Sequence, residues 1–495
     1  MAARSRIEAI ISSCVSVHPH ETSALLHSFS CFFFVLSAYF LVLPLRDEGA
    51  ISLGLGNLPE LFLGSLALTL LAAPVSAYIF SLPTLSKDRA LLLIHRFFSA
   101  SLIVFYILWN SSSAVHPSLT HKDLKVEENQ ARTGDSIDWA QHGWFYVTVR
   151  ICFFLWVALL NLITISSTWA RVIDAMDNES GSRLFGFIGA GATLGQLFGS
   201  LFASGMAWLG PFLLLVAAFF MELAAQSSKG IIQDKINLPE ELSLPRKTNH
   251  DEPDEAVNQS GSAPQGSSPE LTTTLVRPPG WALLDGIRLI LSSTYLLFVS
   301  LFIWLSAVVS SFFYFQKVSI IAMAVDSPLG RRRLFAQINS FIAVFILAGQ
   351  LTLTGRILTI AGVAMAICSA PFVALSSLIT ITVWPTWIAV AVSETLRKVV
   401  NYVVARPGRE LLFTVVSQDE KYKAKICIDV IVQRLGDAAA AGMYKLLFSI
   451  LNGRTSTASV YPLPVCLVWI IVAFHVGGRQ TKLAKLQSHS GEYRA

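Results

Sequence analysis

Charged side chains lie within two apolar stretches of this chain. Arg46 and Asp47 lie in the first stretch. Glu394, Arg397 and Lys398 lie in the second, at three- and four-residue steps that place them on one face of a helix. A charge at mid-membrane costs about 2.5–3.5 kcal/mol on insertion scales, so charges kept there usually face a polar path or a ligand. The pattern predicts a polytopic membrane protein whose charged interior binds an anion.

Each of these groups also has a simpler interpretation. Arg46 and Asp47 could form an ion pair at the membrane surface, and Glu394 could form a salt bridge to a neighbouring base of its own helix. Tyr402 extends the second group by one turn, and a polar stripe on a membrane helix must face protein or water. We therefore predict that both groups, with Tyr402, line a substrate chamber.

Further charges lie in other apolar stretches. Arg150 comes early in one stretch, where it could extend to the membrane surface, and Arg434 and Asp437 lie at helical steps in another. We predict that all three contribute to the substrate site, with Asp437 and Glu394 holding the bases apart when no substrate is bound. A second set is predicted to close the cytoplasmic mouth: Arg171, Asp174, Arg183, Lys423 and Asp429.

The composition indicates that these residues are positioned by membrane helices. Hydrophobic residues make up 53% and charged residues 14% of the chain, against roughly 25% charged residues in soluble domains. The predicted fold class is an all-α membrane protein with about 12 transmembrane helices in two six-helix pseudo-repeats of the major-facilitator type. The apolar blocks lie near 24–45, 58–82, 91–109, 145–169, 184–208, 209–226, 287–313, 334–354, 357–383, 386–406, 426–451 and 458–476.

A polar central segment divides the blocks into equal sets. Residues 227–286 are rich in Ser, Pro and acidic residues, and such a composition cannot bury enough apolar surface to fold alone. We predict a flexible cytoplasmic linker there, between six-helix bundles at 1–226 and 287–478. Residues 479–495 are predicted to be a cytoplasmic tail.

The Lys and Arg residues of the short loops predict that both termini are cytosolic. One loop disagrees, because Arg331, Arg332 and Arg333 would then face outward. Residues 1–26 have the features of neither a transit peptide nor a cleaved secretory signal, so they assign no organelle.

Small residues are dense in the fifth block, where Gly195 and Gly199 have GxxxG spacing. This spacing predicts close packing against another helix.

Other classes of function have no support in the sequence. The net charge of +5 is spread over loops, and no basic patch with interleaved aromatic residues indicates nucleic-acid binding. No metal-ligand spacing, nucleophile triad or P-loop occurs, so neither a cofactor nor an enzyme is predicted.

A series of motifs runs from the first block to the eleventh. They are Leu43-Pro44-Leu45-Arg46-Asp47, Asn161 with Trp169 and Asp174, the glycine-rich run 183–191, Leu353-Thr-Gly355-Arg356, Arg406-Pro407-Gly408-Arg409-Glu410, and Arg434-Leu-Gly436-Asp437. Together these motifs resemble the ATP/ADP carrier (nucleotide transporter) family of plastids and obligate intracellular bacteria, which is related to the major facilitator superfamily.

The resemblance implies twelve membrane helices and exchange of ATP for ADP, or of another phosphorylated anion, across a lipid bilayer. It also implies that charged helix residues are needed for transport, and Arg46 aligns with one such basic position. Arg150 stands where the exchangers have an acidic residue, and Asp437 stands where they have lysine. Reversed charges alter which anion is tolerated. A plastid envelope is one location that fits the resemblance.

Two other functions fit the same residues. In a proton-coupled carrier of a different organic anion or metabolite, Asp47 or Glu394 would titrate. In a membrane scaffold or sensor that does not transport, neutral substitutions of Arg46 and Arg397 would leave activity intact.

Overall fold

The regular structure of the described residues is helical. The computed structural model describes residues 21–81, 87–114, 143–175, 178–231, 287–352, 354–416, 424, 427–450 and 460–492. In these ranges no strand occurs, and ten helices are long and apolar enough to cross a membrane. The prediction of an all-α membrane protein is therefore confirmed.

The first half contains six long helices. In chain order its elements are α2 (Thr22–Ser52), η1 (Leu55–Asn57), α3 (Leu58–Ser81), α4 (Lys87–Ala114), α6 (Trp144–Ala175), α7 (Asn178–Gly205), η2 (Ala207–Phe212) and α8 (Leu213–Ser228).

The second half contains more interruptions. Its elements are α10 (Thr294–Ala324), α11 (Pro328–Thr352), α12 (Thr354–Val383), α13 (Trp387–Val400), η3 (Asn401–Ala405), α14 (Arg406–Leu411), η4 (Leu412–Val415), η5 (Ile428–Val432), α16 (Gln433–Ile450) and α18 (Pro462–Glu492).

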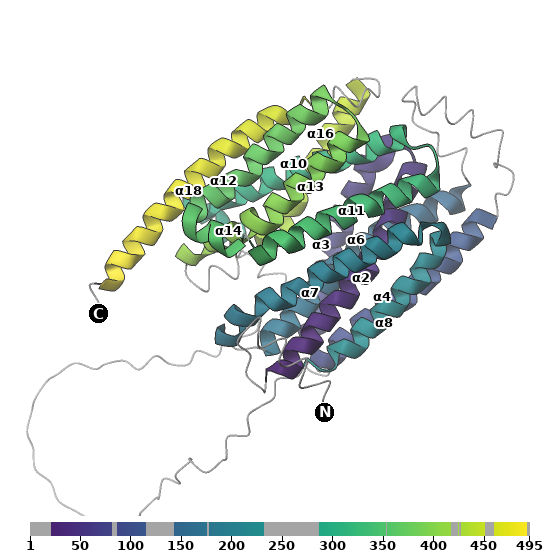
Figure 1. The fold of residues 1–495 in the computed structure, drawn as a ribbon, viewed down its shortest axis with the longest axis horizontal. Coiled ribbons are helices and arrows are strands. Elements are labelled where there is room, and N and C mark those ends of the chain that lie inside the picture. Colours follow the sequence, from purple (N-terminus) through teal and green to yellow (C-terminus); the bar gives the residue numbers. More distant parts are fainter. Residues whose placement is uncertain are drawn as a thin grey trace, which may run out of the picture.

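The two halves form two bundles that lie side by side (Figure 1). Within the bundles, α2 packs on α7 and α8, and α10 packs on α16 and α18. Between them, α7 packs on α11 and α3 on α16. Helix α2 begins and helix α18 ends at the same end of the bundles (Figure 1). We call the opposite end, where α2 finishes and α6 and α11 begin, the distal end.

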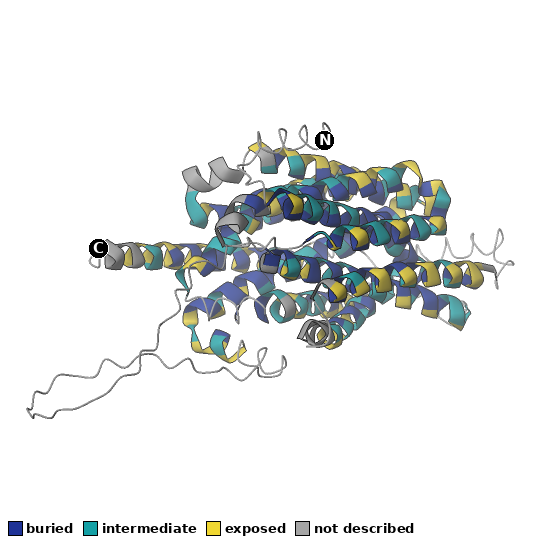
Figure 2. Cartoon of the chain, turned by 90° about the horizontal axis from the view of Figure 1, so that it is seen from below, coloured by how far each residue is buried: buried dark blue, intermediate teal, exposed yellow. Residues whose placement is uncertain are grey.

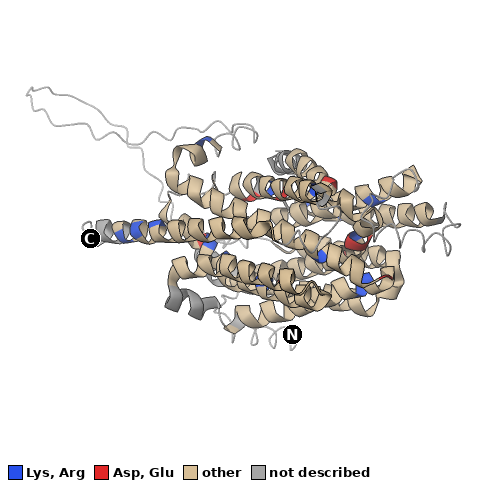
Figure 3. Ribbon diagram, turned by 90° about the horizontal axis from the view of Figure 1, so that it is seen from above, with Lys and Arg blue, Asp and Glu red and all other residues tan. Residues whose placement is uncertain are grey.

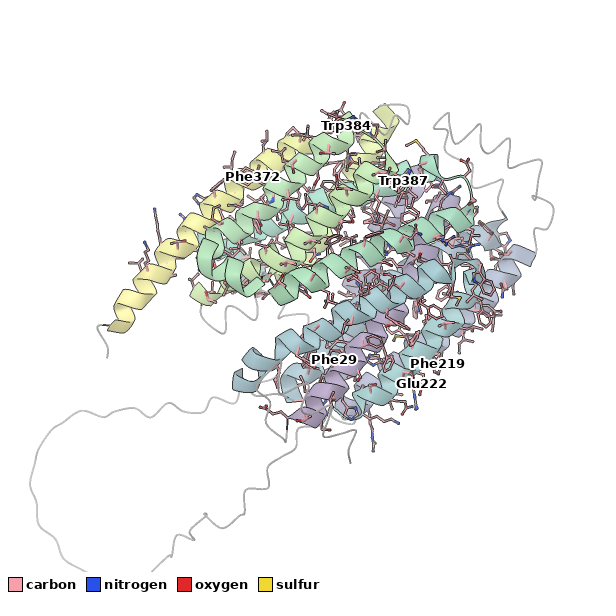
Figure 4. The ribbon with its side chains drawn as sticks, in the orientation of Figure 1. Phe29, Phe219, Glu222, Phe372, Trp384 and Trp387 are labelled. Atoms are coloured by element: carbon pink, nitrogen blue, oxygen red, sulfur yellow. The ribbon has the colours of Figure 1, made fainter. Side chains whose placement is uncertain are left out.

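Glycines of α7 allow the closest helix packing in the first half. A Cβ atom at Gly191 would lie 2.7 Å from the Phe29 carbonyl oxygen, and one at Gly199 would lie 2.5 Å from that of Ser37. At Gly195 a Cβ atom would collide with the Phe33 carbonyl. Phe29 lies where α2 faces α7 (Figure 4). The predicted close packing of this glycine-rich helix is confirmed.

Apolar side chains cover the outside of the bundles. Phe341, Phe345, Ile471 and Phe474 are exposed, and exposed residues follow the outer faces of the helices (Figure 2). Charges are sparse along most helices, and several lie on the final part of α18 (Figure 3). This distribution of side chains suits contact with lipid. The helical backbone suits it too, because its hydrogen bonds are formed within each helix.

The predicted tenth and eleventh spans differ from the ten apolar helices. The π-helical segment η3 interrupts the tenth, and η5 begins the eleventh. Pro407 explains the first interruption, because it has no N–H to donate to the residue four positions earlier. Such π-helical segments are frequent at functional sites. Twelve crossings and the two-fold repeat remain predictions.

The predicted division into domains also remains untested. Helix α8 ends at Ser228, and residues 232–286 of the predicted linker lie outside the described residues. Helix α18 continues through the predicted tail as far as Glu492.

Candidate anion-binding site

An ion pair on α2 is hydrogen-bonded to Tyr314 of α10, across the two halves. Arg46 Nη2 lies 2.6 Å from Asp47 Oδ1, and the Tyr314 hydroxyl donates to the same oxygen at 2.9 Å. Arg46 also approaches the Tyr314 hydroxyl oxygen at 3.3 Å. The Asp47 side chain is only 1% exposed. Pro44 lies inside α2 just before the pair, and proline bends a helix by removing a backbone hydrogen bond.

A second group gathers three bases around one carboxylate. Glu394 Oε2 accepts from Arg397 Nη2 at 2.6 Å, and Glu394 Oε1 lies 3.3 Å from Lys398 Nζ. Lys317 Nζ of α10 lies 3.9 Å from the same Oε1 atom. The three- and four-residue steps on α13 thus bring its charges together as predicted. Lys317 adds a cation that the prediction did not contain.

The face of α10 that carries Tyr314 and Lys317 connects the two groups. These residues are three positions apart, so they lie on one face of the helix, and Lys317 interacts electrostatically with both Glu394 and Asp47. We call this set the central cluster: Arg46, Asp47, Tyr314, Lys317, Glu394, Arg397 and Lys398. It has four bases against two carboxylates. The excess of two positive charges suits an anionic ligand.

Aromatic rings and a hydroxyl complete the surroundings of the two arginines. Arg46 Cζ lies 4.9 Å from the centre of the Phe154 ring, which brings α6 to the cluster. Arg397 Cζ lies 4.6 Å from the Phe313 ring, and Arg397 Nη1 donates to Ser310 at 3.1 Å. Cation–π contacts of this kind hold a guanidinium group in place without neutralising its charge.

Lys317 and Tyr314 were missed in the sequence, although a signal for Lys317 was present. Lys317 lies inside an apolar helix of 31 residues, so the rule applied to Arg46 and Arg397 applies to it equally. Tyr314 gave no such signal, because a tyrosine among aromatic residues is ordinary in an apolar helix.

Arg150 lies apart from the central cluster. Its side chain is 7% exposed and its guanidinium group stacks on Trp109. Its electrostatic partners are Glu48 on α2, Arg332 on α11 and the nearby Tyr146. The structure therefore places this predicted substrate residue at the distal end, buried in protein.

Arg434 and Asp437 form a local group on α16. Arg434 Nη1 lies 3.3 Å from Asp437 Oδ2, and Ser311 of α10 donates to Asp437 Oδ1 at 2.6 Å. These contacts lie within the second half, and Ser311 lies three positions before Tyr314 on α10.

Tyr402 lies near the central cluster, within electrostatic range of Tyr39, and the Arg406 guanidinium carbon lies 5.6 Å from its ring centre.

The described members of the predicted cytoplasmic gate make contacts within their own halves. Arg171 donates to the Ile231 carbonyl at 2.7 Å, and Arg409 pairs with Asp429 at 3.0 Å. The side chains of Asp174 and Arg183, and the whole of Lys423, lie outside the described residues. The gate therefore stays a prediction.

An apolar cluster joins the two halves at the distal end. The Phe62 ring of α3 packs on Phe315 of α10, with ring centres 4.7 Å apart, and Phe312 and Tyr444 lie in the same cluster. Glu60 of α3 also pairs with Lys445 of α16. In this structure the two halves are thus in contact beyond the central cluster.

Tyr314→Phe is expected to lower the free energy of unfolding by about 1–3 kcal/mol, because it leaves the buried Asp47 carboxylate one donor short. Unfolding in mixed micelles of increasing SDS content measures the loss of stability. The matched change Tyr461→Phe, at an exposed ring, should alter stability by less than about 0.5 kcal/mol. Equal effects of the two changes would contradict the role given to Tyr314.

The helices and their packing define a class of protein, an all-α, multi-pass membrane protein. A POT family transporter in complex with 5-aminolevulinic acid superposes with a TM-score of 0.54, 13% identity, and coverage of 94% of this chain and 97% of that one. A bacterial homologue of the iron transporter ferroportin, in its outward-facing state, superposes with a TM-score of 0.52 and 13% identity. The match covers 94% of this chain and 100% of that one. At these identities the likeness concerns the fold alone.

Residues 318–480 match the model of the TLC ATP/ADP transporter family. The resemblance found in the sequence motifs is therefore confirmed over this part of the chain, which includes α11 to α16 and the charged face of α13. No curated protein sequence matches the chain. The family match indicates a transporter. Among the described residues, no group of three or more His, Cys, Asp or Glu side chains could hold a metal ion.

Proposed function

We propose that this protein exchanges ATP for ADP, or a closely related phosphorylated anion, by alternating access. The observation that carries the proposal is the excess of two positive charges in the central cluster, enclosed where α2, α10 and α13 meet. The TLC family match supports a nucleotide as the ligand. Phosphate oxygens suit the site, since arginine binds them with paired hydrogen bonds and lysine as a point charge.

Substrate phosphates would take the place of the two carboxylates as partners of the bases. Glu394 holds Lys317, Arg397 and Lys398 together while no substrate is bound, and Asp47 does the same for Arg46. A bound phosphate chain would draw on the excess positive charge and weaken these internal pairs. Asp437, which we predicted to hold the bases apart together with Glu394, accepts hydrogen bonds from Ser311 and Arg434.

The central cluster can couple binding to movement because its residues belong to both halves. Arg46 and Asp47 come from the first half, and Tyr314 and the three remaining bases come from the second. A ligand that changes the Arg46–Asp47–Tyr314 contacts would therefore change how strongly the halves hold together. Counter-substrate binding from the other side would then drive the return step, which gives obligatory exchange.

The orientation of the protein in the membrane decides which side the distal end faces. We propose that both termini are cytosolic, which makes the distal end the outer one. The structure would then represent a state in which the outer end is closed by the Phe62 cluster and the Glu60–Lys445 pair. The plastid envelope remains the membrane we propose to test first.

Uptake of labelled ADP into vesicles tests the exchange. We expect purified protein to take up ADP only when the vesicles contain ATP or ADP, and Arg46→Gln and Arg397→Gln to reduce the initial rate by at least about a hundredfold, since each removes a charge-assisted contact from the substrate. Arg96→Gln is the matched control, because Arg96 lies at the periphery and is half exposed. Uptake that is independent of internal nucleotide would refute exchange.

A proton-coupled carrier of another organic anion is the second candidate. Asp47 and Glu394 are carboxylates buried inside the protein, as such a mechanism requires. For this function an imposed pH gradient would drive uptake into vesicles without internal nucleotide. The same vesicles therefore discriminate between the two candidates.

A further inference from the structure

The loop whose orientation disagreed with the charge rule lies beside the buried Arg150. Arg331 and Arg332 begin α11 at the distal end, and both interact electrostatically with Glu48 of α2. Glu48 also interacts with Arg150, which is more than nine-tenths buried. Three arginines from the two halves of the protein thus interact electrostatically with one buried carboxylate.

The arginines of this group differ in how far their N–H donors are used. Arg331 donates to the carbonyls of Val325 and Asp326, at 2.8 Å from Nε and 2.7 Å from Nη2, so it holds the loop before α11. Among the described residues, Arg150 Nε and Nη1 have no hydrogen-bond acceptor although they are buried, and the same holds for Arg332 Nε. Within the described part of the chain, Arg150 and Arg332 therefore keep free donors, and Glu48 is the carboxylate that interacts with both.

The surroundings of both arginines are shaped to hold them. The guanidinium group of Arg150 lies over Trp109, with the Tyr146 ring centre 4.7 Å from its carbon. Arg332 rests on Gly210 of η2, where a Cβ atom would lie 3.2 Å from Nη1. Gly210 has φ of 53°, so glycine suits this position both for its backbone and for the space it leaves.

We propose that Arg150 and Arg332 form a second phosphate-binding site at the distal end, separate from the central cluster. Its ligand is a phosphate group, either the terminal phosphate of the transported anion on its way in or a lipid headgroup. A phosphate between these residues would join the first half to the second, because Arg150 lies on α6 and Arg332 on α11. Phosphate binding would then account for the arginines of a loop that is predicted to face outward. The role in substrate entry rests on the proposed function, whereas the binding of phosphate does not.

Phosphate binding is measurable through Trp109, which stacks on Arg150. The experiment uses full-length Arg397→Gln protein in nanodiscs of phosphatidylcholine, so that the central cluster is weakened. We expect inorganic phosphate to change the tryptophan emission. Adding Arg150→Gln or Arg332→Gln should raise the half-saturating phosphate concentration at least tenfold. Trp109→Phe should remove the emission change and so assign the signal.

Arg333→Gln is the matched control, since Arg333 is the exposed neighbour of Arg332, and it should leave the phosphate response within twofold of the parent. Arg150→Lys keeps the charge but loses the paired donors. Its phosphate response should lie between that of the parent and that of Arg150→Gln, and this conservative variant should remain folded. Gly210→Ala should weaken the response by displacing Arg332.

Nanodiscs with phosphatidylglycerol distinguish the two sources of phosphate. If the emission change appears there without added phosphate and disappears with Arg150→Gln, the ligand is a lipid headgroup. If it needs added phosphate in either lipid, the ligand is a soluble anion. A response that is unaffected by both Arg150→Gln and Arg332→Gln, or no response in any disc, overturns the second site.

The transport assay separates this proposal from the proposed function. If ADP exchange occurs, Arg332→Gln should raise the external KM for ADP at least fivefold and leave the internal KM unchanged. Equal effects on both sides would contradict a role in entry. If neither the parent protein nor any variant exchanges ADP, the proposed nucleotide exchange is refuted. The nanodisc experiment still decides whether phosphate binds at the distal end.

Discussion

Glu394→Gln is expected to lower the free energy of unfolding by about 3–5 kcal/mol, the usual consequence of removing one partner from a buried ion pair. Three bases share this carboxylate, at 2.6 Å for Arg397, 3.3 Å for Lys398 and 3.9 Å for Lys317. Glutamine has nearly the same volume, so the loss would be electrostatic. Exchange of nucleotide should fall together with stability, because the bases would repel one another in the substrate-free protein.

Unfolding by SDS in mixed micelles measures this effect, and a second substitution tests its cause. Lys317→Met in the Glu394→Gln background removes one of the unpaired bases, and it should restore at least about a third of the lost stability. Glu222→Gln is the control, because Glu222 pairs with Arg96 on the exposed surface of α8 (Figure 4). A surface pair contributes only about 0–1 kcal/mol. If Glu394→Gln matched this control, the shared counter-ion model would be wrong.

Gly195→Leu should prevent folding of the first half. A Cβ atom at this position would collide with the Phe33 carbonyl of α2, and a backbone atom cannot turn aside as a side chain can. Overpacking costs about 1–3 kcal/mol even where side chains can adjust, and here α2 and α7 must separate along their length. We expect no monodisperse protein after solubilisation in a mild detergent, as measured by size-exclusion chromatography.

Gly189 provides the matched control on the same helix. A Cβ atom there would meet nothing within 4 Å, so Gly189→Ala should fold normally and, by reducing backbone freedom in a helix, add up to about 1 kcal/mol of stability. A monodisperse Gly195→Leu protein with normal stability would show that α2 and α7 are not in contact there in the membrane.

Much of the fold followed from apolar length alone. A helix of about 20 residues crosses a bilayer and satisfies its own backbone hydrogen bonds. The described parts of the predicted apolar blocks are accordingly largely helical. Apolar length alone did not predict the eleventh block as clearly. Gln433, Arg434 and Asp437 lie in the first two turns of α16, and the π-helical η5 precedes them. Its polar face reduces the apolar signal, and tertiary packing supplies the stability instead.

The candidate site was predicted in part. Local spacing placed Glu394, Arg397 and Lys398 on one helix face, and the structure brings them together. Spacing within one helix carries no information about which helices meet, so the pairing of Asp47 with Tyr314 could not be predicted. For the same reason the spacing could not show that Arg150 lies on Trp109 at the distal end.

The sequence by itself determined that this chain is a helical membrane protein with charges inside, because hydrophobic length and the cost of a buried charge are properties of single segments. Its motifs also identified the TLC ATP/ADP transporter resemblance, which residues 318–480 confirm. Only the tertiary structure decided which charges share a site. That choice depends on contacts among α2, α10 and α13, which are far apart along the chain and meet only when the two halves pack together.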